Sequence, residues 1–200
     1  MAEPIKIEVF KTKNPGDLTA ALADPDSRLD FGGGAALSAS VAAALLERAA
    51  ARCDQSNERA AYILRNAEIV RKYMVHVIDE DVKSRAPLKR ALREGGEREI
   101  EAARHPALAI PGEVVNMMGQ TIDMALDLSA LCPKEAMHYL GECVELALGA
   151  MKASRLYIID MADQCSDDTF RYINRRENEI TLKQYGETAA QVLAAVEAAI

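Results

Sequence analysis

The 200-residue sequence has no tryptophan, and aromatic residues make up only 4% of it. No apolar run approaches the ~20 residues that a membrane-spanning helix needs. The N-terminal stretch Met1–Lys13 also lacks the apolar centre of a secretory signal peptide. With neither a membrane segment nor an export signal, the sequence predicts a cytoplasmic protein that makes no membrane contact.

Positive charge is also scarce. The chain carries 24 Lys and Arg residues against 31 Asp and Glu residues, a net charge of −7. Proteins that bind duplex nucleic acid need a basic face, so we expect no nucleic-acid partner. Half of the residues are hydrophobic, which is enough for a large core. The length is typical of one domain, and we predict a single domain over residues 1–200.

The sequence lacks the cysteine and histidine patterns of a metal protein. Its cysteines form no Cys-x-x-Cys pair and are expected to be reduced, buried thiols, although a zinc site or a disulfide framework is the alternative. One Glu-x-x-His pair occurs, Glu135 and His138, whereas di-iron bundles need two such pairs and two further glutamates. We therefore predict no metal site.

The spacing of apolar residues predicts an all-α fold, a bundle of about six helices with short connections. Glycine and proline pairs separate the periodic segments. The expected helices span Leu18–Leu22, Ala35–Cys53, Glu58–Asp81, a short charged piece ending at Arg104, Val114–Leu131, Lys134–Met161 and about Asp167–Ile200. The stretch Ile5–Phe10 alternates apolar and polar residues, which predicts a short strand or an arm packed on the bundle.

Three consecutive glycines, Gly32, Gly33 and Gly34, precede an alanine-rich helix. Such residues let the main chain approach a ligand and expose the free N–H groups of the helix, which favour anions. The alternative is a tight turn where helices cross closely. The triplet does not complete the Gly-x-Gly-x-x-Gly pattern of a dinucleotide site.

The clearest amphipathic segment closes with Asp79, Glu80 and Asp81. Asp81 follows Val77 by four residues and Met74 by seven, so it lies on the buried stripe, whereas Glu80 faces water. A carboxylate on an apolar face takes up a proton more readily, which suits general acid–base chemistry. The alternative is structural: Asp81 caps a following helix or pairs with an arginine or lysine.

The stretch Lys83–Arg104 carries a local excess of three positive charges. It would attract an acidic small molecule, or it forms a solvated helix face. Within it, Ala86-Pro87 is expected to disfavour a straight helix.

Taken in order, several segments resemble the cyclodeaminase/cyclohydrolase family of tetrahydrofolate enzymes. This family includes the C-terminal domain of formiminotransferase-cyclodeaminase and bacterial methenyltetrahydrofolate cyclohydrolases. The similarity runs from Leu18 to the C-terminus. Four segments show the similarity. Phe31–Ala35 matches a Pro-Gly-Gly-Gly-Ser start, and Ile78–Val82 matches an Asp-x-Asp segment. Ala109–Pro111 matches a Val-Pro before a helix, and Ser166–Phe170 resembles the turn before the last helix.

The resemblance implies an all-helical homodimer that binds a tetrahydrofolate derivative near the subunit contact, with no prosthetic group. It makes Asp81, the second aspartate of the pair, the catalytic residue. The glycine triplet would approach the pterin or its anionic tail. The substrate-binding residues that it implies are Gly32, Gly33, Gly34, Asp79, His138, Tyr139 and Tyr157.

The implied activity is conversion of 5-formimino-tetrahydrofolate to 5,10-methenyl-tetrahydrofolate with release of ammonia, or hydrolysis of the methenyl compound. Several positions depart from the family pattern: Phe31 and Ala35 beside the glycines, Cys132-Pro133, His138-Tyr139, and Tyr157 and Met161 in place of two asparagines. These departures motivate an alternative, a non-catalytic relative that binds a folate or another acidic metabolite, or a helical interaction module.

Overall fold

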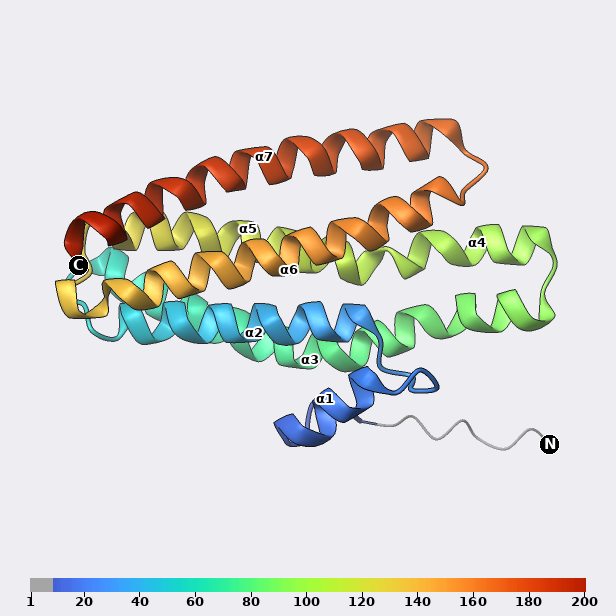
Figure 1. Ribbon diagram of the computed structural model, residues 1–200, viewed down its shortest axis with the longest axis horizontal. Helices are drawn as coiled ribbons and strands as arrows, with labels where there is room; N and C mark the ends of the chain where they lie inside the picture. Colours follow the sequence, from blue (N-terminus) through green and yellow to red (C-terminus); the bar gives the residue numbers. More distant parts are fainter. Residues whose placement is uncertain (1–8) are drawn as a thin grey trace.

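The structure, a computed structural model, describes residues 9–200. Its elements are α1 (Pro15–Ala23), α2 (Phe31–Ala50), α3 (Glu58–Glu94), α4 (Glu97–Ala107), α5 (Ala109–Ser129), a short 3₁₀ turn (Lys134–Ala136), α6 (Met137–Asp163) and α7 (Asp168–Ala199). Residues 9–200 contain no strand, and α2 to α7 form an elongated bundle (Figure 1). The predicted all-α bundle of about six helices is confirmed. Most of the stretch Ile5–Phe10 lies outside the described residues.

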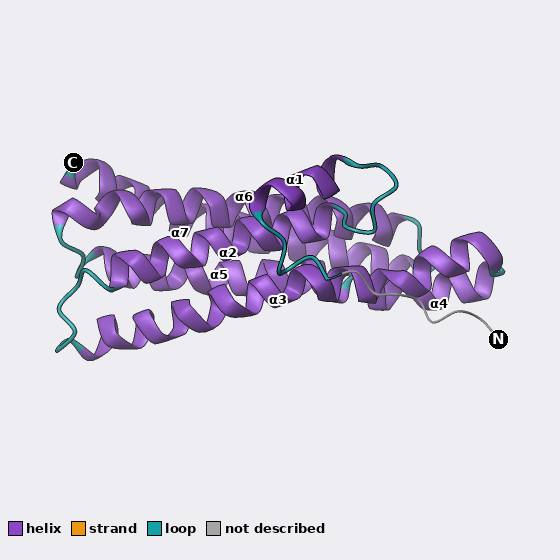
Figure 2. Cartoon of the chain, turned by 90° about the horizontal axis from the view of Figure 1, so that it is seen from below, coloured by secondary structure: helices purple, strands orange, loops and turns teal. Residues whose placement is uncertain are grey.

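The helices run back and forth along the long axis of the bundle. α2 packs most extensively against α3 and α6, while α5 lies against α6 and α7. α3 and α4 form a hairpin that extends past the other helices at one end, and α1 lies across the outside of the bundle (Figures 1 and 2). Among the described residues, no helix has the length and apolar character to cross a membrane.

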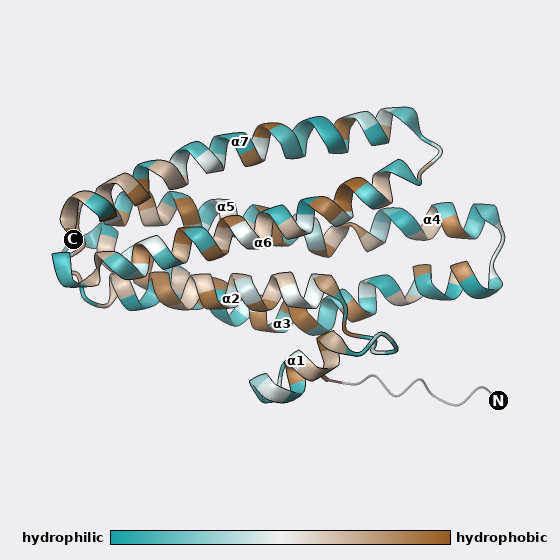
Figure 3. Cartoon of the chain, in the orientation of Figure 1, coloured by the Kyte–Doolittle hydropathy of each residue, from teal (hydrophilic) through white to brown (hydrophobic). Residues whose placement is uncertain are grey.

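The alanine-rich helix α2 is central, as its composition predicts. Ala36, Ala39, Ala42 and Ala43 have no exposed surface. Small side chains let neighbouring helices approach closely, and α2 contacts α3, α5 and α6. By contrast, the first half of α7 is mostly hydrophilic and has no buried residue before Ala189 (Figure 3).

The glycine triplet lies inside the first turn of α2, which corrects the expectation of a turn before the helix. The N-cap is Asp30, whose side chain accepts a hydrogen bond from the backbone N–H of Phe31 at 2.9 Å. An aspartate at this position satisfies one of the free N–H groups, so the helix begins four residues earlier than predicted. No described glycine has a positive φ, so close packing explains the triplet better than turn geometry.

The prediction that the amphipathic helix closes at Asp81 is wrong. α3 continues through Pro87 to Glu94, and Leu88 and Ala91 beyond the proline are buried. Burial of these side chains outweighs the hydrogen bond that Pro87 removes. The continuation matters because it places Arg85 on the same helix as Asp81, one turn further on.

Other helix limits differ less. Asn14 caps α1, and its side chain accepts a hydrogen bond from Asp17 N at 2.9 Å, so the helix begins three residues before the predicted Leu18. α5 begins at Ala109 rather than Val114, because Pro111 fits within the first turn of a helix, where its missing N–H costs nothing.

Candidate functional site

The Asp81 carboxylate lies in the interior of the bundle. The residue has no exposed surface, as the helical stripe predicts. Neither carboxylate oxygen has an aligned hydrogen-bond donor among the described residues. A buried acid without such donors binds a proton more tightly than an aspartate in water. This is the environment expected of a general acid–base group.

Gly32 makes this position possible. A β-carbon at Gly32 would lie 2.5 Å from Cγ of Asp81 and closer still to its Oδ1. Only a residue without a side chain lets the carboxylate sit against the first turn of α2. That turn carries free N–H groups and the positive end of the helix dipole, which stabilise a negative charge.

Arg85 joins the buried acid to a second carboxylate. Its Nη2 lies 2.9 Å from Oδ2 of Asp81, an ion pair without hydrogen-bond alignment. Its Nη1 donates a hydrogen bond of 2.7 Å to Oδ2 of Asp30, whose side chain is half exposed. The Arg85 side chain itself is only 5% exposed. The three groups thus form a chain of charges from the surface to the interior.

Two aromatic rings lie against this arginine. The rings of Phe31 and Tyr157 are stacked with centroids 4.2 Å apart. The Arg85 guanidinium lies 5.3 Å from the Phe31 centroid and 5.8 Å from that of Tyr157, within the range of cation–π contacts. Of the residues predicted to bind substrate, Tyr157 is therefore brought close to Asp81 and the glycines. Phe31, a departure from the family pattern, belongs to the same cluster.

The charges of the cluster shift its pKa values. Burial raises the pKa of Asp81, and the Arg85 charge and the Gly33 amide offset only part of this effect. Although burial acts against it, hydrogen bonds from Arg85 and the Phe31 amide lower the pKa of Asp30. Burial likewise raises the pKa of Tyr157. Beside the same arginine, Asp30 therefore loses its proton more readily than an ordinary aspartate, and Asp81 loses its proton less readily.

Asp79, predicted to bind substrate, contacts the N-terminal segment rather than the cluster around Asp81. Its Oδ1 accepts hydrogen bonds from the backbone N–H groups of Phe10, at 2.7 Å, and Lys11, at 3.3 Å. Phe10 is 1% exposed, so these contacts hold a buried side chain that lies 69 residues away in the sequence. The contacts of Asp79 thus anchor the N-terminal segment to α3.

We expect Asp79→Ala to lower the free energy of unfolding by about 1–3 kcal/mol, because the Phe10 N–H would be buried without an acceptor. Asp79→Asn keeps one acceptor oxygen and should cost less. Urea unfolding of the two variants measures the difference. Equal stabilities for wild type and Asp79→Ala would contradict the anchoring role.

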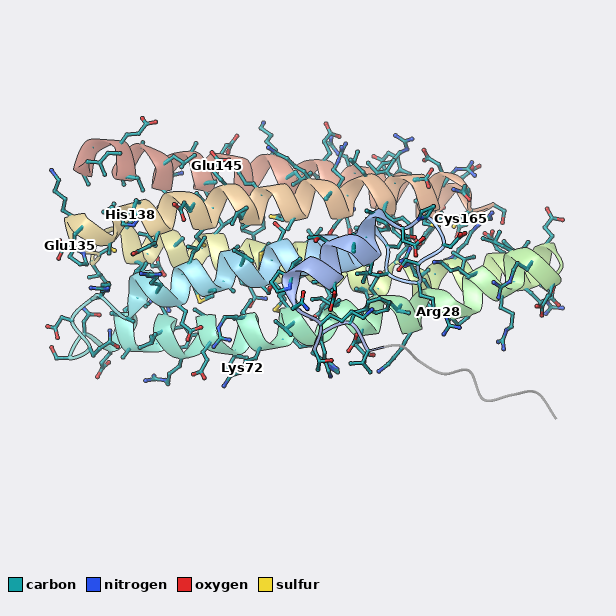
Figure 4. The ribbon with its side chains drawn as sticks, turned by 60° about the horizontal axis from the view of Figure 1, so that its bottom comes forward. Arg28, Lys72, Glu135, His138, Glu145 and Cys165 are labelled. Carbon is teal, nitrogen blue, oxygen red and sulfur yellow. The ribbon has the colours of Figure 1, made fainter. Side chains whose placement is uncertain are left out.

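His138 and Tyr139 are not brought to the glycine triplet within one chain. They lie at the start of α6, about 28 Å along the helix from Tyr157 at a rise of 1.5 Å per residue. Figure 4 places His138 at the end of the bundle opposite Cys165. Tyr139 stacks with Arg48 in the last turn of α2, at 4.7 Å. A substrate-binding role for this pair stays a prediction.

Arg85 and Asp30 belong to the cluster, yet they were not singled out from the sequence. Arg85 follows Asp81 by four residues, and this spacing would have revealed it had the helix been extended past Pro87. Ser154 has no exposed surface and its hydroxyl has no partner among the described residues. It lies one turn before Tyr157 on α6, and no sequence pattern marks it.

One group of potential metal ligands lies elsewhere. Single ligand atoms of Glu101, His105 and Cys165 are all within 4.8 Å of one another. The Glu101 carboxylate already accepts hydrogen bonds from the backbone and hydroxyl of Ser166, at 2.8 and 3.0 Å, and pairs with Arg104. The adjacent arginine charge opposes a cation, and the contacts tie α4 to the turn before α7.

No protein-family model matches the sequence, and no curated protein matches it at a significant level. The structure, however, is similar to the crystal structure of formiminotetrahydrofolate cyclodeaminase from Thermotoga maritima, with a TM-score of 0.86 and 16% sequence identity. The match covers 94% of this chain and 98% of that one. The resemblance seen in the sequence is therefore confirmed at the level of the fold: the chain has the fold of formiminotetrahydrofolate cyclodeaminase.

Proposed function

We propose that this chain is a cytoplasmic, homodimeric enzyme of tetrahydrofolate one-carbon chemistry. It converts 5-formimino-tetrahydrofolate to 5,10-methenyl-tetrahydrofolate with release of ammonia, or it hydrolyses the methenyl compound. Asp81 is the catalytic residue, and the first turn of α2 with Tyr157 forms part of the substrate site. The proposal needs no prosthetic group, since the tetrahydrofolate derivative is the substrate.

The burial of Asp81 against Gly32 is the observation that carries this proposal. In cyclodeamination, N10 attacks the carbon of the protonated formimino group and forms the N10–C bond, which turns the C=N bond into a single bond to a neutral amino group. Asp81 takes the N10 proton and returns a proton to the amino group, which leaves as ammonia when its C–N bond breaks. In cyclohydrolysis, water attacks the methenyl carbon and the same carboxylate accepts a proton from it. Asp81 then returns a proton to N5 as the N5–C bond breaks, and loss of the hydroxyl proton leaves a formyl group on N10. One positioned group of this kind contributes on the order of 10²–10⁴ in rate.

The second candidate is a relative that binds a folate or another acidic metabolite without turnover. The arrangement around Asp81 favours it: the carboxylate is paired with Arg85, and the Phe31–Tyr157 stack lies against that arginine. Substrate reaches Asp81 only if these side chains are displaced, and a binding protein needs no such access.

The test combines calorimetric titration with an absorbance assay. The purified protein is titrated with tetrahydrofolate, and consumption or formation of 5,10-methenyl-tetrahydrofolate is followed spectroscopically. Turnover supports the enzyme, and tight binding without turnover supports the second candidate. Failure to bind any folate would contradict the enzyme and the folate-binding form of the second candidate.

A further inference from the structure

Arg85 occupies an unusual position between two unequal carboxylates. It bonds to Asp30 in a half-exposed position at the start of α2 and pairs with Asp81 in the interior. Its Nε and Nη2 have no aligned hydrogen-bond partner among residues 9–200. A buried arginine usually satisfies its donors, so this one is held by charge and by the flanking rings rather than by a complete hydrogen-bond set.

We propose that Arg85 is a positioning residue: its guanidinium is shared between Asp30 and Asp81, and this sharing sets how readily Asp81 takes up and releases a proton. The catalytic consequence rests on the proposed function, whereas the titration of Asp81 does not. Asp30 thereby acts on the reaction from the surface, through Arg85, without touching substrate.

The charged groups around Asp81 come from several elements. Arg85 and Lys89 lie on α3, Asp30 lies at the start of α2, and the phenol of Tyr157 lies on α6. Lys89 is 3.9 Å from the Asp30 carboxylate, so Asp30 has a second cationic partner beside Arg85. Removing the Asp30 charge leaves Arg85 to Asp81 alone, which favours the ionised form of Asp81. Removing the Arg85 charge does the opposite.

The decisive variants are Asp30→Asn and Arg85→Gln. Asparagine at position 30 keeps a side-chain oxygen to cap α2, so this variant is expected to fold even if Arg85→Gln does not. Glu80→Gln is the matched control. It removes one negative charge from the residue next to Asp81, but Glu80 pairs with Lys83 on the outer face of α3.

The readout is the titration of the Asp81 carboxyl carbon by ¹³C NMR, assigned by its loss in Asp81→Asn. Asp30→Asn should move the midpoint to lower pH, and Arg85→Gln should move it to higher pH by about 1–3 units. Glu80→Gln should leave it in place. If the wild-type protein turns over a folate, the acidic limb of the pH–rate profile should move in the same directions in Asp30→Asn and Arg85→Gln.

Two results would overturn the inference: an unchanged Asp81 midpoint in a folded Asp30→Asn, or an equal shift in Glu80→Gln. Lower stability without a change of midpoint would mean that Arg85 is structural only. If the midpoints shift as expected but no variant and no wild-type protein turns over a folate, Arg85 has its role and the proposed activity is wrong.

Discussion

Replacement of Asp81 by asparagine should lower turnover of the tetrahydrofolate substrate by a factor on the order of 10²–10⁴. Asparagine has nearly the same shape, but it cannot accept the N10 proton or return one to the leaving amine. Arg85 keeps its hydrogen bond to Asp30, so the buried cation retains a partner and the bundle should still fold. The measurement is the initial rate of change in methenyl-tetrahydrofolate absorbance, with circular dichroism as the check on folding.

The pH dependence of stability gives the same variant a second readout. Because burial raises the pKa of Asp81 above its ordinary value, the folded protein holds a proton that the unfolded chain has released. The contribution of this group to the free energy of unfolding therefore falls as pH rises from the ordinary pKa through the raised one. Asp81→Asn should remove that part of the slope. Near-normal turnover with an unchanged slope would show that Asp81 is not the acid–base group.

Gly32→Ala is the second change with a large expected effect. The new β-carbon would overlap the Asp81 carboxylate, which has no exposed surface. Overpacking of this kind costs about 1–3 kcal/mol, and the displaced carboxylate should also lower turnover. Urea unfolding and the absorbance assay measure the two losses.

Gly34→Ala is the matched control within the same triplet. A β-carbon at Gly34 would lie 3.6 Å from the nearest atom of Leu22, an ordinary van der Waals contact. Alanine in a helix is favoured over glycine by about 0.5–1 kcal/mol, so this variant should be slightly more stable than wild type. If Gly32→Ala and Gly34→Ala behaved alike, the triplet would not be explained by the approach of Asp81.

The helices and the buried position of Asp81 were predictable from the sequence because both follow from the 3.6-residue period. The end of α3 was not predictable. Pro87 disfavours a helix locally, whereas the burial of Leu88 stabilises one, and burial depends on neighbouring helices that a single sequence does not show. Arg85 was missed as the partner of Asp81 because it lies beyond the predicted end of the helix.

The rest of the site depends on distances that no local pattern encodes. His138 and Tyr139 were predicted to bind substrate because they replace two residues of a family pattern. Their place at the far end of α6 is set by the antiparallel course of α2 and α6. The hydrogen bonds between Asp79 and the Phe10 segment span 69 residues, so the anchoring contact is visible only in three dimensions.

The unequal packing of α2 and α7 bears on how this protein can diverge over generations. Most replacements along the alanine-lined faces of α2 enlarge a side chain that has no surplus volume around it, and each should be removed by selection. No residue of α7 before Ala189 is fully buried, so substitutions there should be tolerated more readily. Related chains would then be recognised by their second helix long after their last one had become unalignable.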